Sequence, residues 1–179
     1  ITNMSDINKS HWVADKNQIH AQVGFTKVDK ENRLVSGFAT LDNEDTHDDV
    51  VEAVASRQAF ERFRGNIREM HQPIAVGKIV SYEPKEYLDA ETGEVHKGVY
   101  VSVYVSTGAE DTWQKVLDGT LSGFSIGGNV IDAQNDIDPE TGQPFRRVKK
   151  YMLTELSLVD NPANQFSNVD SIAKVIGVA

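Results

Sequence analysis

The sequence predicts an α+β fold, a mostly antiparallel β-barrel of six or seven strands flanked by two or three helices. Short runs rich in β-branched and aromatic residues recur along the chain and are separated by turn-forming residues. These runs do not alternate regularly with helical segments, and no glycine-rich phosphate loop appears, which argues against a parallel α/β sheet. A closed barrel and a strongly curved sheet both fit this pattern.

The composition is that of one soluble globular domain. The chain has 179 residues, 39% of them hydrophobic and 25% charged, and we expect a flexible arm over 1–20 and a single domain over 21–179. The absence of cysteine excludes disulfides and thiolate metal sites. No apolar run approaches the ~20 residues that span a bilayer, and a net charge of −9 argues against a duplex nucleic-acid partner.

Strands are expected where β-branched and apolar residues cluster between turn signals. The ranges are 21–29, 33–41, 74–84, 95–106, 121–131 and 149–160. Two loops of nearly the same sequence, DAETGE at 89–94 and DPETGQ at 138–143, are typical of hairpin connections. In each, aspartate starts the turn and glycine takes the positive φ.

Helices are expected over 56–70, 108–118 and 168–176. Ser56 is a candidate N-cap of the first helix, which Gly65 is expected to bend or end. In the second helix, Thr107 and Glu110 have the spacing of a capping box, and Gly119 lies just after the expected end.

Two charged segments are interpreted as surface features. The acidic stretch DNEDTHDD at 42–49 lacks the glycine and the terminal glutamate of a calcium loop, so a loop is the better interpretation than a metal site. The basic stretch FRRVKK at 145–150 favours a solvated strand face or a hairpin edge, where charge discourages edge pairing.

The stretch LSGFSIGGNV at 121–130 is unusually rich in glycine for a strand. Because side chains alternate between the two faces of a strand, Ser122 shares a face with Phe124 and Ile126 and is expected to lie inward. Ser125 lies on the other face, with a glycine two residues before it and two after it. That clearance suits a nucleophilic serine that must approach a peptide carbonyl. A glycine-rich bend at a barrel corner is the alternative, and a bulge would reverse the choice between the serines.

A serine nucleophile needs a base, and histidine is the usual one near neutral pH. Four of the five histidines lie in or near the polar arm, in the acidic loop or beside a hairpin turn, and are expected at the surface: His11, His20, His47 and His96. His71 differs because it lies at the junction between the first helix and a strand, which holds a side chain rigidly at a sheet edge.

Glu155 is the best candidate for an acceptor that orients such a histidine. It is the one acidic residue inside the apolar strand YMLTELSLV, where an unpaired buried carboxylate would be costly. An outward-facing surface position explains it equally well from the pattern alone. Asp160 and the acids at 42–49 are lesser candidates.

Taken together, four segments resemble the prohead (capsid maturation) serine proteases of tailed bacteriophages. They occur in the order of that family and cover roughly residues 33–166: VSGFATLDNEDTHDDVVEA, MHQPIAVGKI, LSGFSIGG and TELSLVDNPAN. The family is related in fold to the herpesvirus assemblin proteases, so the resemblance implies a β-barrel with surrounding helices. The segment THDDVV departs from the usual glycine-containing form, and Met70 stands where an aromatic residue is common.

The resemblance also implies the site. By position, His71 is the base, Ser125 the nucleophile and Glu155 the third member of a triad, in agreement with the choice from strand faces. We expect backbone N–H groups to stabilise the oxyanion, with Gly127, Gly128 and Asn161 as candidates. No metal or cofactor is implied.

The function implied is that of a serine endopeptidase of phage assembly. Its substrates would be scaffold segments, extensions of the major capsid protein and the chain itself, inside the immature prohead in the host cytoplasm. Self-cleavage would account for a chain that begins at Ile1. A homodimer or ordering of the site by substrate would control it, and neither nucleic acid nor membrane is an expected partner. The alternatives are a non-catalytic capsid-assembly or scaffold module with the same fold and a general barrel-type binding domain.

Overall fold

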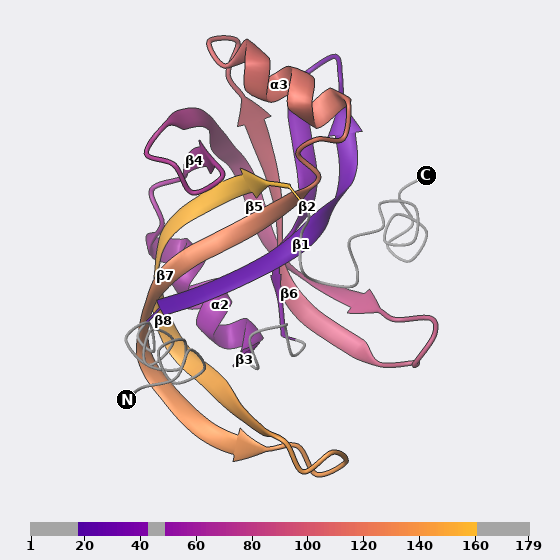
Figure 1. Cartoon of the computed structure of the whole chain (residues 1–179), viewed down its shortest axis with the longest axis vertical. Coiled ribbons are helices and arrows are strands. Elements are labelled where there is room, and N and C mark those ends of the chain that lie inside the picture. The colour runs from indigo at the N-terminus through magenta and orange to yellow at the C-terminus, as the bar shows by residue number, and fades with distance from the viewer. Residues whose placement is uncertain (1–17, 43–48, 161–179) are drawn as a thin grey trace, which may run out of the picture.

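Seven strands of the chain close into a mixed β-barrel (Figure 1). The structure is a computed structural model that describes residues 18–42 and 49–160, apart from the side chains of residues 20 and 21. The strands are β1 (Gln18–Asp29), β2 (Leu34–Leu41), β3 (Asp49–Val51), β4 (Asn66–Glu69), β5 (Ala75–Leu88), β6 (Val95–Val105), β7 (Gly123–Ile137) and β8 (Pro144–Val159). The described helices are α2 (Ala53–Arg62) and α3 (Glu110–Leu117).

The ring runs β8-β4-β5-β6-β2-β1-β7 and closes through the pairing of β7 with β8. Every described pairing is antiparallel except two, in which β3 and β4 each run parallel to β8. The helix α2 connects β3 to β4, which lie on either side of β8. The predicted α+β barrel is confirmed. The predicted arm, 1–20, lies outside the described residues except for its last three, which belong to β1.

The predicted helix over 56–70 is wrong at both ends. The helix α2 begins at Ala53, three residues before the predicted N-cap, and Ser56 is buried inside it, where its hydroxyl accepts a hydrogen bond from Tyr151 at 3.0 Å. The helix ends at Arg62. Gly65 then takes a φ of +89°, which turns the chain into β4. The apolar residue assigned to the helix at position 67 instead lies in β4, fully buried in the barrel.

The second helix was predicted more closely. The helix α3 spans Glu110–Leu117, and Gly119 follows it with a φ of +83°, as expected of a glycine that ends a helix. The predicted capping box is wrong, because the N-cap is Ala109, which makes no side-chain cap hydrogen bond. The predicted terminal helix over 168–176 lies outside the described residues.

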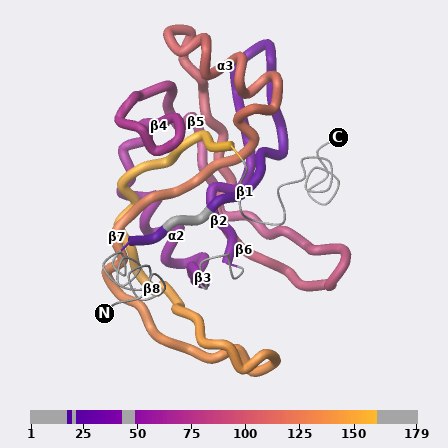
Figure 2. Tube along the Cα trace, viewed as in Figure 1, coloured from indigo at the N-terminus to yellow at the C-terminus, as the bar shows by residue number. Residues whose placement is uncertain are grey.

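Two long hairpins, β5–β6 and β7–β8, extend beyond the barrel (Figure 2). Both turns have the predicted chemistry. Asp89 and Asp138 each accept, through Oδ1, the N–H of the residue two positions later, at 2.9 and 2.8 Å. Gly93 and Gly142 have φ values of +75° and +71°. Local turn chemistry therefore fixes both hairpin registers.

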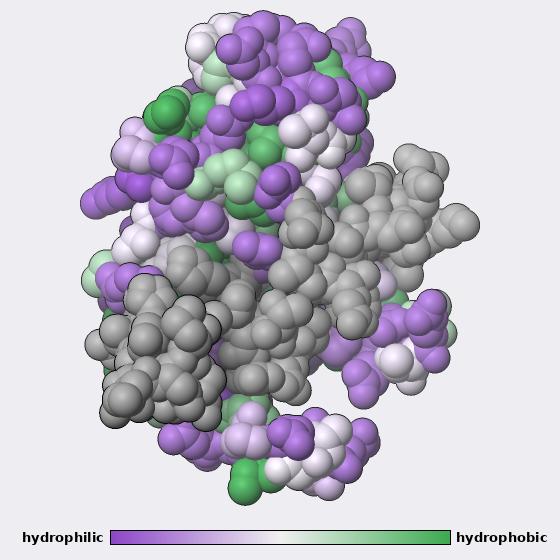
Figure 3. All heavy atoms as spheres, in the orientation of Figure 1, coloured by the Kyte–Doolittle hydropathy of each residue, from purple (hydrophilic) through white to green (hydrophobic). Residues whose placement is uncertain are grey.

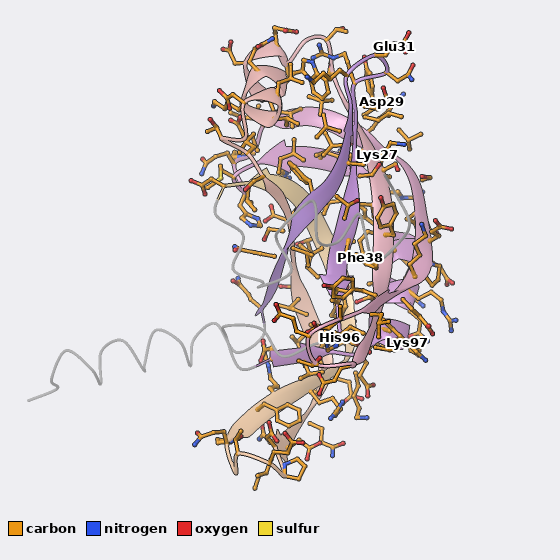
Figure 4. All side chains as sticks on the ribbon, turned by 90° about the vertical axis from the view of Figure 1, so that its right-hand side faces the viewer. Lys27, Asp29, Glu31, Phe38, His96 and Lys97 are labelled. Atoms are coloured by element: carbon orange, nitrogen blue, oxygen red, sulfur yellow. The ribbon has the colours of Figure 1, made fainter. Side chains whose placement is uncertain are left out.

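The main apolar core fills the barrel and includes residues from every strand and from both helices. Phe124 and Ile126 of β7 are fully buried in it, as the strand pattern predicted. A second cluster, around Phe38 of β2, lies apart from this core, and there the Phe38 ring meets Tyr87 and Tyr100 edge-on (Figure 4). The long β5–β6 hairpin thus has an apolar anchor of its own on the barrel.

The visible part of the face in Figure 3 is mostly polar. Over α3 the exposed residues are largely hydrophilic, and hydrophobic residues appear as small separate patches (Figure 3). The basic stretch at 145–150 lies on β8, where acidic residues neutralise it: Arg146 binds Asp49 at 2.6 Å, and Lys149 binds Glu52 at 3.4 Å. No helix in the described part of the chain is long and apolar enough to cross a membrane.

Candidate active site

A row of polar side chains crosses four neighbouring strands of the barrel. Gln22 of β1 pairs with Ser125 of β7, which pairs with Ser157 of β8, and Ser157 pairs with Arg68 of β4. The flanking residues of β7 point into the core, so alternation turns Ser125 away from the barrel interior. The sheet register therefore brings residues far apart in sequence to one place on the outer face.

His71 lies in a tight turn that follows β4 directly. Met70 and His71 have φ values of +50° and +60°, and the N–H of Gln72 donates to the carbonyl oxygen of Glu69 at 2.9 Å, as in a type I′ turn. Left-handed backbone is unfavourable for both residues. A hydrogen bond to β8 holds the turn in this conformation, because the His71 N–H donates to the Ser157 hydroxyl at 3.1 Å.

The side chains of Glu155, His71 and Ser125 form one continuous chain of hydrogen bonds. The Nε2 atom of His71 lies 2.9 Å from the Oγ atom of Ser125. On the other side of the ring, the Nδ1 atom of His71 contacts Oε1 of Glu155. With Nδ1–H donated to the carboxylate, Nε2 is left as the acceptor for the serine hydroxyl. This arrangement can remove a proton from Ser125 and hold the resulting imidazolium.

Gly127 leaves room for the Glu155 carboxylate. The two residues pair across β7 and β8, and a Cβ atom added at position 127 would lie 2.7 Å from Oε1 of Glu155. The sequence predicted the glycines around Ser125 as clearance for a substrate backbone. At Gly127 the side chain of Glu155 takes that space instead. Glycine is needed at position 128 for a different reason, because an added Cβ would lie 2.2 Å from the carbonyl oxygen of Met152.

The side chains of the site differ in how far they are buried. Ser125 and Ser157 are fully buried, whereas the side chains of Glu155 and His71 are 15% and 28% exposed. Arg68 is the most open, with 40% of its side chain exposed, and its Nη1 atom donates to Oε2 of Glu155 at 3.2 Å. The imidazole is thus reached by solvent from one side, and the serine hydroxyl is covered.

Two other predicted candidates in the described residues, Ser122 and His96, are not brought to this site. Ser122 precedes β7, and its backbone N–H and carbonyl bind Val159 and Phe25. His96 lies near Asp42 and Glu94, with 3.8 Å between the charged atoms in each pair. His11, His47, Asn161 and the side chain of His20 lie outside the described residues.

Sequence reasoning missed two residues of the site, Ser157 and Arg68. Both are polar residues next to apolar ones in a buried strand pair, where Ile67 lies opposite Leu156. Alternation along β8 also places Ser157 on the same face as Glu155, and that signal was available in the sequence. In the described part of the chain, no group of three or more histidine or acidic residues could hold a metal ion.

Comparison with known proteins identifies the family of this chain. The model of the family described as "Putative phage serine protease XkdF" matches residues 22–134, which is more than half of the chain. The matched range includes His71 and Ser125 and ends before Glu155. Searches among curated proteins and among solved structures gave no match. The predicted kinship with phage serine proteases is confirmed, and the chain belongs to the XkdF family of phage serine proteases.

Proposed function

We propose that this protein is a serine endopeptidase in which Ser125 is the nucleophile, His71 the general base and Glu155 the residue that orients His71. The observation that supports this most directly is the unbroken chain of hydrogen bonds from Glu155 through His71 to Ser125. A non-catalytic assembly module with the same fold has no need of a base held in a strained turn against a serine. The phage serine protease family gives independent support.

The reaction follows from the atoms in contact. The Oγ atom of Ser125 attacks the peptide carbonyl carbon while its proton passes to Nε2 of His71. Collapse of the tetrahedral intermediate breaks the C–N bond, and His71 returns the proton to the departing amine. A water molecule then attacks the acyl-enzyme with His71 again as base, which releases the acid and restores Ser125. Glu155 stays ionised and stabilises the imidazolium in both steps.

Backbone N–H groups near Ser125 complete the proposed mechanism by stabilising the oxyanion. Gly127 and Gly128 follow the nucleophile on β7 and remain the candidates within the described residues, and Asn161 is the candidate beyond them. One such donor is worth about 3–4 kcal/mol of transition-state stabilisation.

The proposed substrates are scaffold segments, extensions of the major capsid protein and the chain itself, cleaved inside the immature prohead. The family supports a phage role, and the resemblance of the four sequence segments supports capsid maturation. Because Ser125 is fully buried, the site must open before a substrate carbonyl can reach it. Dimerisation or substrate binding is the proposed trigger for that opening.

The test compares wild type with Ser125→Ala and Ser122→Ala. We expect cleavage of the scaffold or capsid precursor, and covalent labelling by a fluorophosphonate probe, in the wild type and in Ser122→Ala. Ser125→Ala should lose labelling entirely and cleavage by about 10³-fold or more. Equal cleavage by wild type and Ser125→Ala would favour the non-catalytic module. Loss of labelling and cleavage in Ser122→Ala alone would assign the nucleophile to Ser122 instead.

A further inference from the structure

We propose that Arg68 is a positioning residue of the catalytic chain, which it extends to four members: Arg68, Glu155, His71 and Ser125. This inference rests on the proposed function. Its physical basis is the position of Glu155 between two partners from the same segment of chain. One oxygen of the Glu155 carboxylate contacts His71, and the other accepts a hydrogen bond from Arg68 at 3.2 Å.

The local fold brings Arg68 to this position. In β4 the preceding residue, Ile67, is fully buried in the barrel, so alternation turns Arg68 to the outer face. Arg68 pairs with Ser157 of β8, and Glu155 lies two residues earlier on the same face of that strand. The guanidinium is therefore diagonal to the carboxylate, within reach of its outer oxygen. One short segment, residues 68–71, supplies both partners of Glu155.

Holding both oxygens prevents the carboxylate from rotating. A carboxylate with one free oxygen can turn about its terminal torsion, which is broad in side chains. With Oε2 fixed by Arg68, Oε1 stays directed at Nδ1 of His71, and the ring keeps Nε2 on Ser125. A guanidinium suits this task better than an ammonium because its N–H groups have a fixed planar geometry.

The positive charge of Arg68 also changes the balance of charge around His71. Glu155 favours the imidazolium, and the guanidinium offsets part of that attraction. Among the described residues, other charged groups near His71 are Glu69 of β4, which binds Lys115 of α3 at 3.2 Å, and Asp160 after β8. On β1, the titratable position nearest in register is His20, which pairs with Gly127. Without the guanidinium, the negative charge of Glu155 would face the His71 ring with no such offset.

A structural role alone does not explain this arrangement. The Arg68 side chain is 40% exposed, and ion pairs this open to solvent add little to folding stability. The consequence expected of Arg68 is therefore kinetic. It should appear in the pH dependence of the serine's reactivity and hardly at all in the stability of the fold.

The experiment measures fluorophosphonate labelling of Ser125 against pH in wild type, Arg68→Met, Arg68→Lys and Arg64→Ala. Methionine keeps the apolar stem and removes the charge, and Arg64 is an exposed arginine just before β4 that serves as a control for net charge. Each protein is also measured with His20→Gln added, so that a contribution of His20 to the pH profile is identified and removed.

We expect Arg68→Met to slow labelling by about tenfold to a hundredfold and to move the acidic limb of the profile upward by about half a pH unit or more. Arg68→Lys should keep the wild-type limb with an intermediate rate, and Arg64→Ala should match wild type. For Arg68→Met, which removes the charge, a slower rate with an unmoved limb overturns the proposal, because Arg68 then does not act through Glu155 and His71. A lowered melting temperature with an unmoved limb also overturns it, because it indicates a purely structural role.

An NMR titration of the His71 ring in the same proteins separates this inference from the proposed function. If the wild type is never labelled and the His71 titration still moves upward in Arg68→Met, the proposed function fails and the Arg68 inference stands. If labelling depends on Ser125 and the titration is the same in both proteins, the Arg68 inference fails alone.

Discussion

At the scale of single residues, Gly127 is as much a part of the site as the side chains themselves. An alanine there would place its Cβ atom 2.7 Å from Oε1 and 2.9 Å from Cγ of Glu155. The obstacle is a side chain that can move, so the fold tolerates the change, but the carboxylate must leave its place beside His71.

We therefore predict that Gly127→Ala lowers peptidase activity by about 100-fold, since small displacements of catalytic groups have effects of that size. Its melting temperature should stay within a few degrees of wild type. Gly128→Ala is the matched comparison. Its added Cβ would lie 2.2 Å from a backbone oxygen, so it should destabilise the fold. If Gly127→Ala keeps full activity, Glu155 does not act through its present position.

The sequence could identify Ser125, His71 and Glu155 because each is unusual in its own segment. One is a serine among glycines, one a histidine at a junction, and one an acid in an apolar strand. The structure brings these three together, and their catalytic roles stay a prediction. Arg68 could not be found in this way, because its importance depends on the parallel pairing of β4 with β8. Nothing near Arg68 in the sequence predicts that pairing.

At the scale of elements, the connection from α2 to β4 sets where His71 lies. The chain leaves the helix at Arg62, and Gly65 makes the turn with a φ of +89°. A Cβ atom added to Gly65 would also lie 2.6 Å from Cγ2 of Ile79. Both the backbone and the space therefore require glycine at this position.

We predict that Gly65→Ala destabilises the protein by about 1–2 kcal/mol from the left-handed backbone alone, with a further cost for displacing Ile79. Gly93→Ala is the control, because Gly93 has a φ of +75° and nothing lies within 4 Å of its added Cβ. Urea unfolding should show a larger loss for Gly65→Ala than for Gly93→Ala. Equal losses would mean that the contact with Ile79 is relieved at no cost.

The elements also show which parts of the fold the sequence determines locally. The two hairpin loops were predicted correctly because aspartate and glycine fix their turns within six residues. The strands β3 and β4 were missed, and they have only three and four residues. Strands so short have little pattern of their own, and pairing with the distant strand β8 defines them. Phe60, Phe63 and Ile67 have helical spacing, which extended the predicted helix past its true end.

At the scale of the whole molecule, several exposed carboxyls make the fold sensitive to acid. Hydrogen bonds from Asn32 lower the pKa of Asp29 below its ordinary value of 3.8, at the β1–β2 turn seen in Figure 4. Hydrogen bonds from Gln114 and then Arg33 lower the pKa of Glu110 below 4.5, and those from Thr120 lower the pKa of Asp118 below 3.8.

The direction in which folding stability changes with pH follows from proton linkage. A carboxyl whose pKa is lower in the folded state stabilises the fold above its unfolded pKa, and this contribution is lost as pH falls through the folded value. We predict that the urea midpoint falls as pH drops below about 4.5. A variant with Asp29→Asn, Glu110→Gln and Asp118→Asn should lose less on acidification. The same acid sensitivity in both proteins would assign the effect to other groups.

The closure of the barrel has a consequence for when the candidate site forms during folding. His71 is 54 residues from Ser125 and 84 residues from Glu155 in sequence, and both contacts depend on β8, which pairs with β7 to complete the ring. Contacts between such distant segments form late in folding. A nascent or partly folded chain therefore lacks the hydrogen bonds from Glu155 through His71 to Ser125. On the proposed mechanism, such a chain cannot cut its neighbours or itself, because activity waits until the barrel is closed.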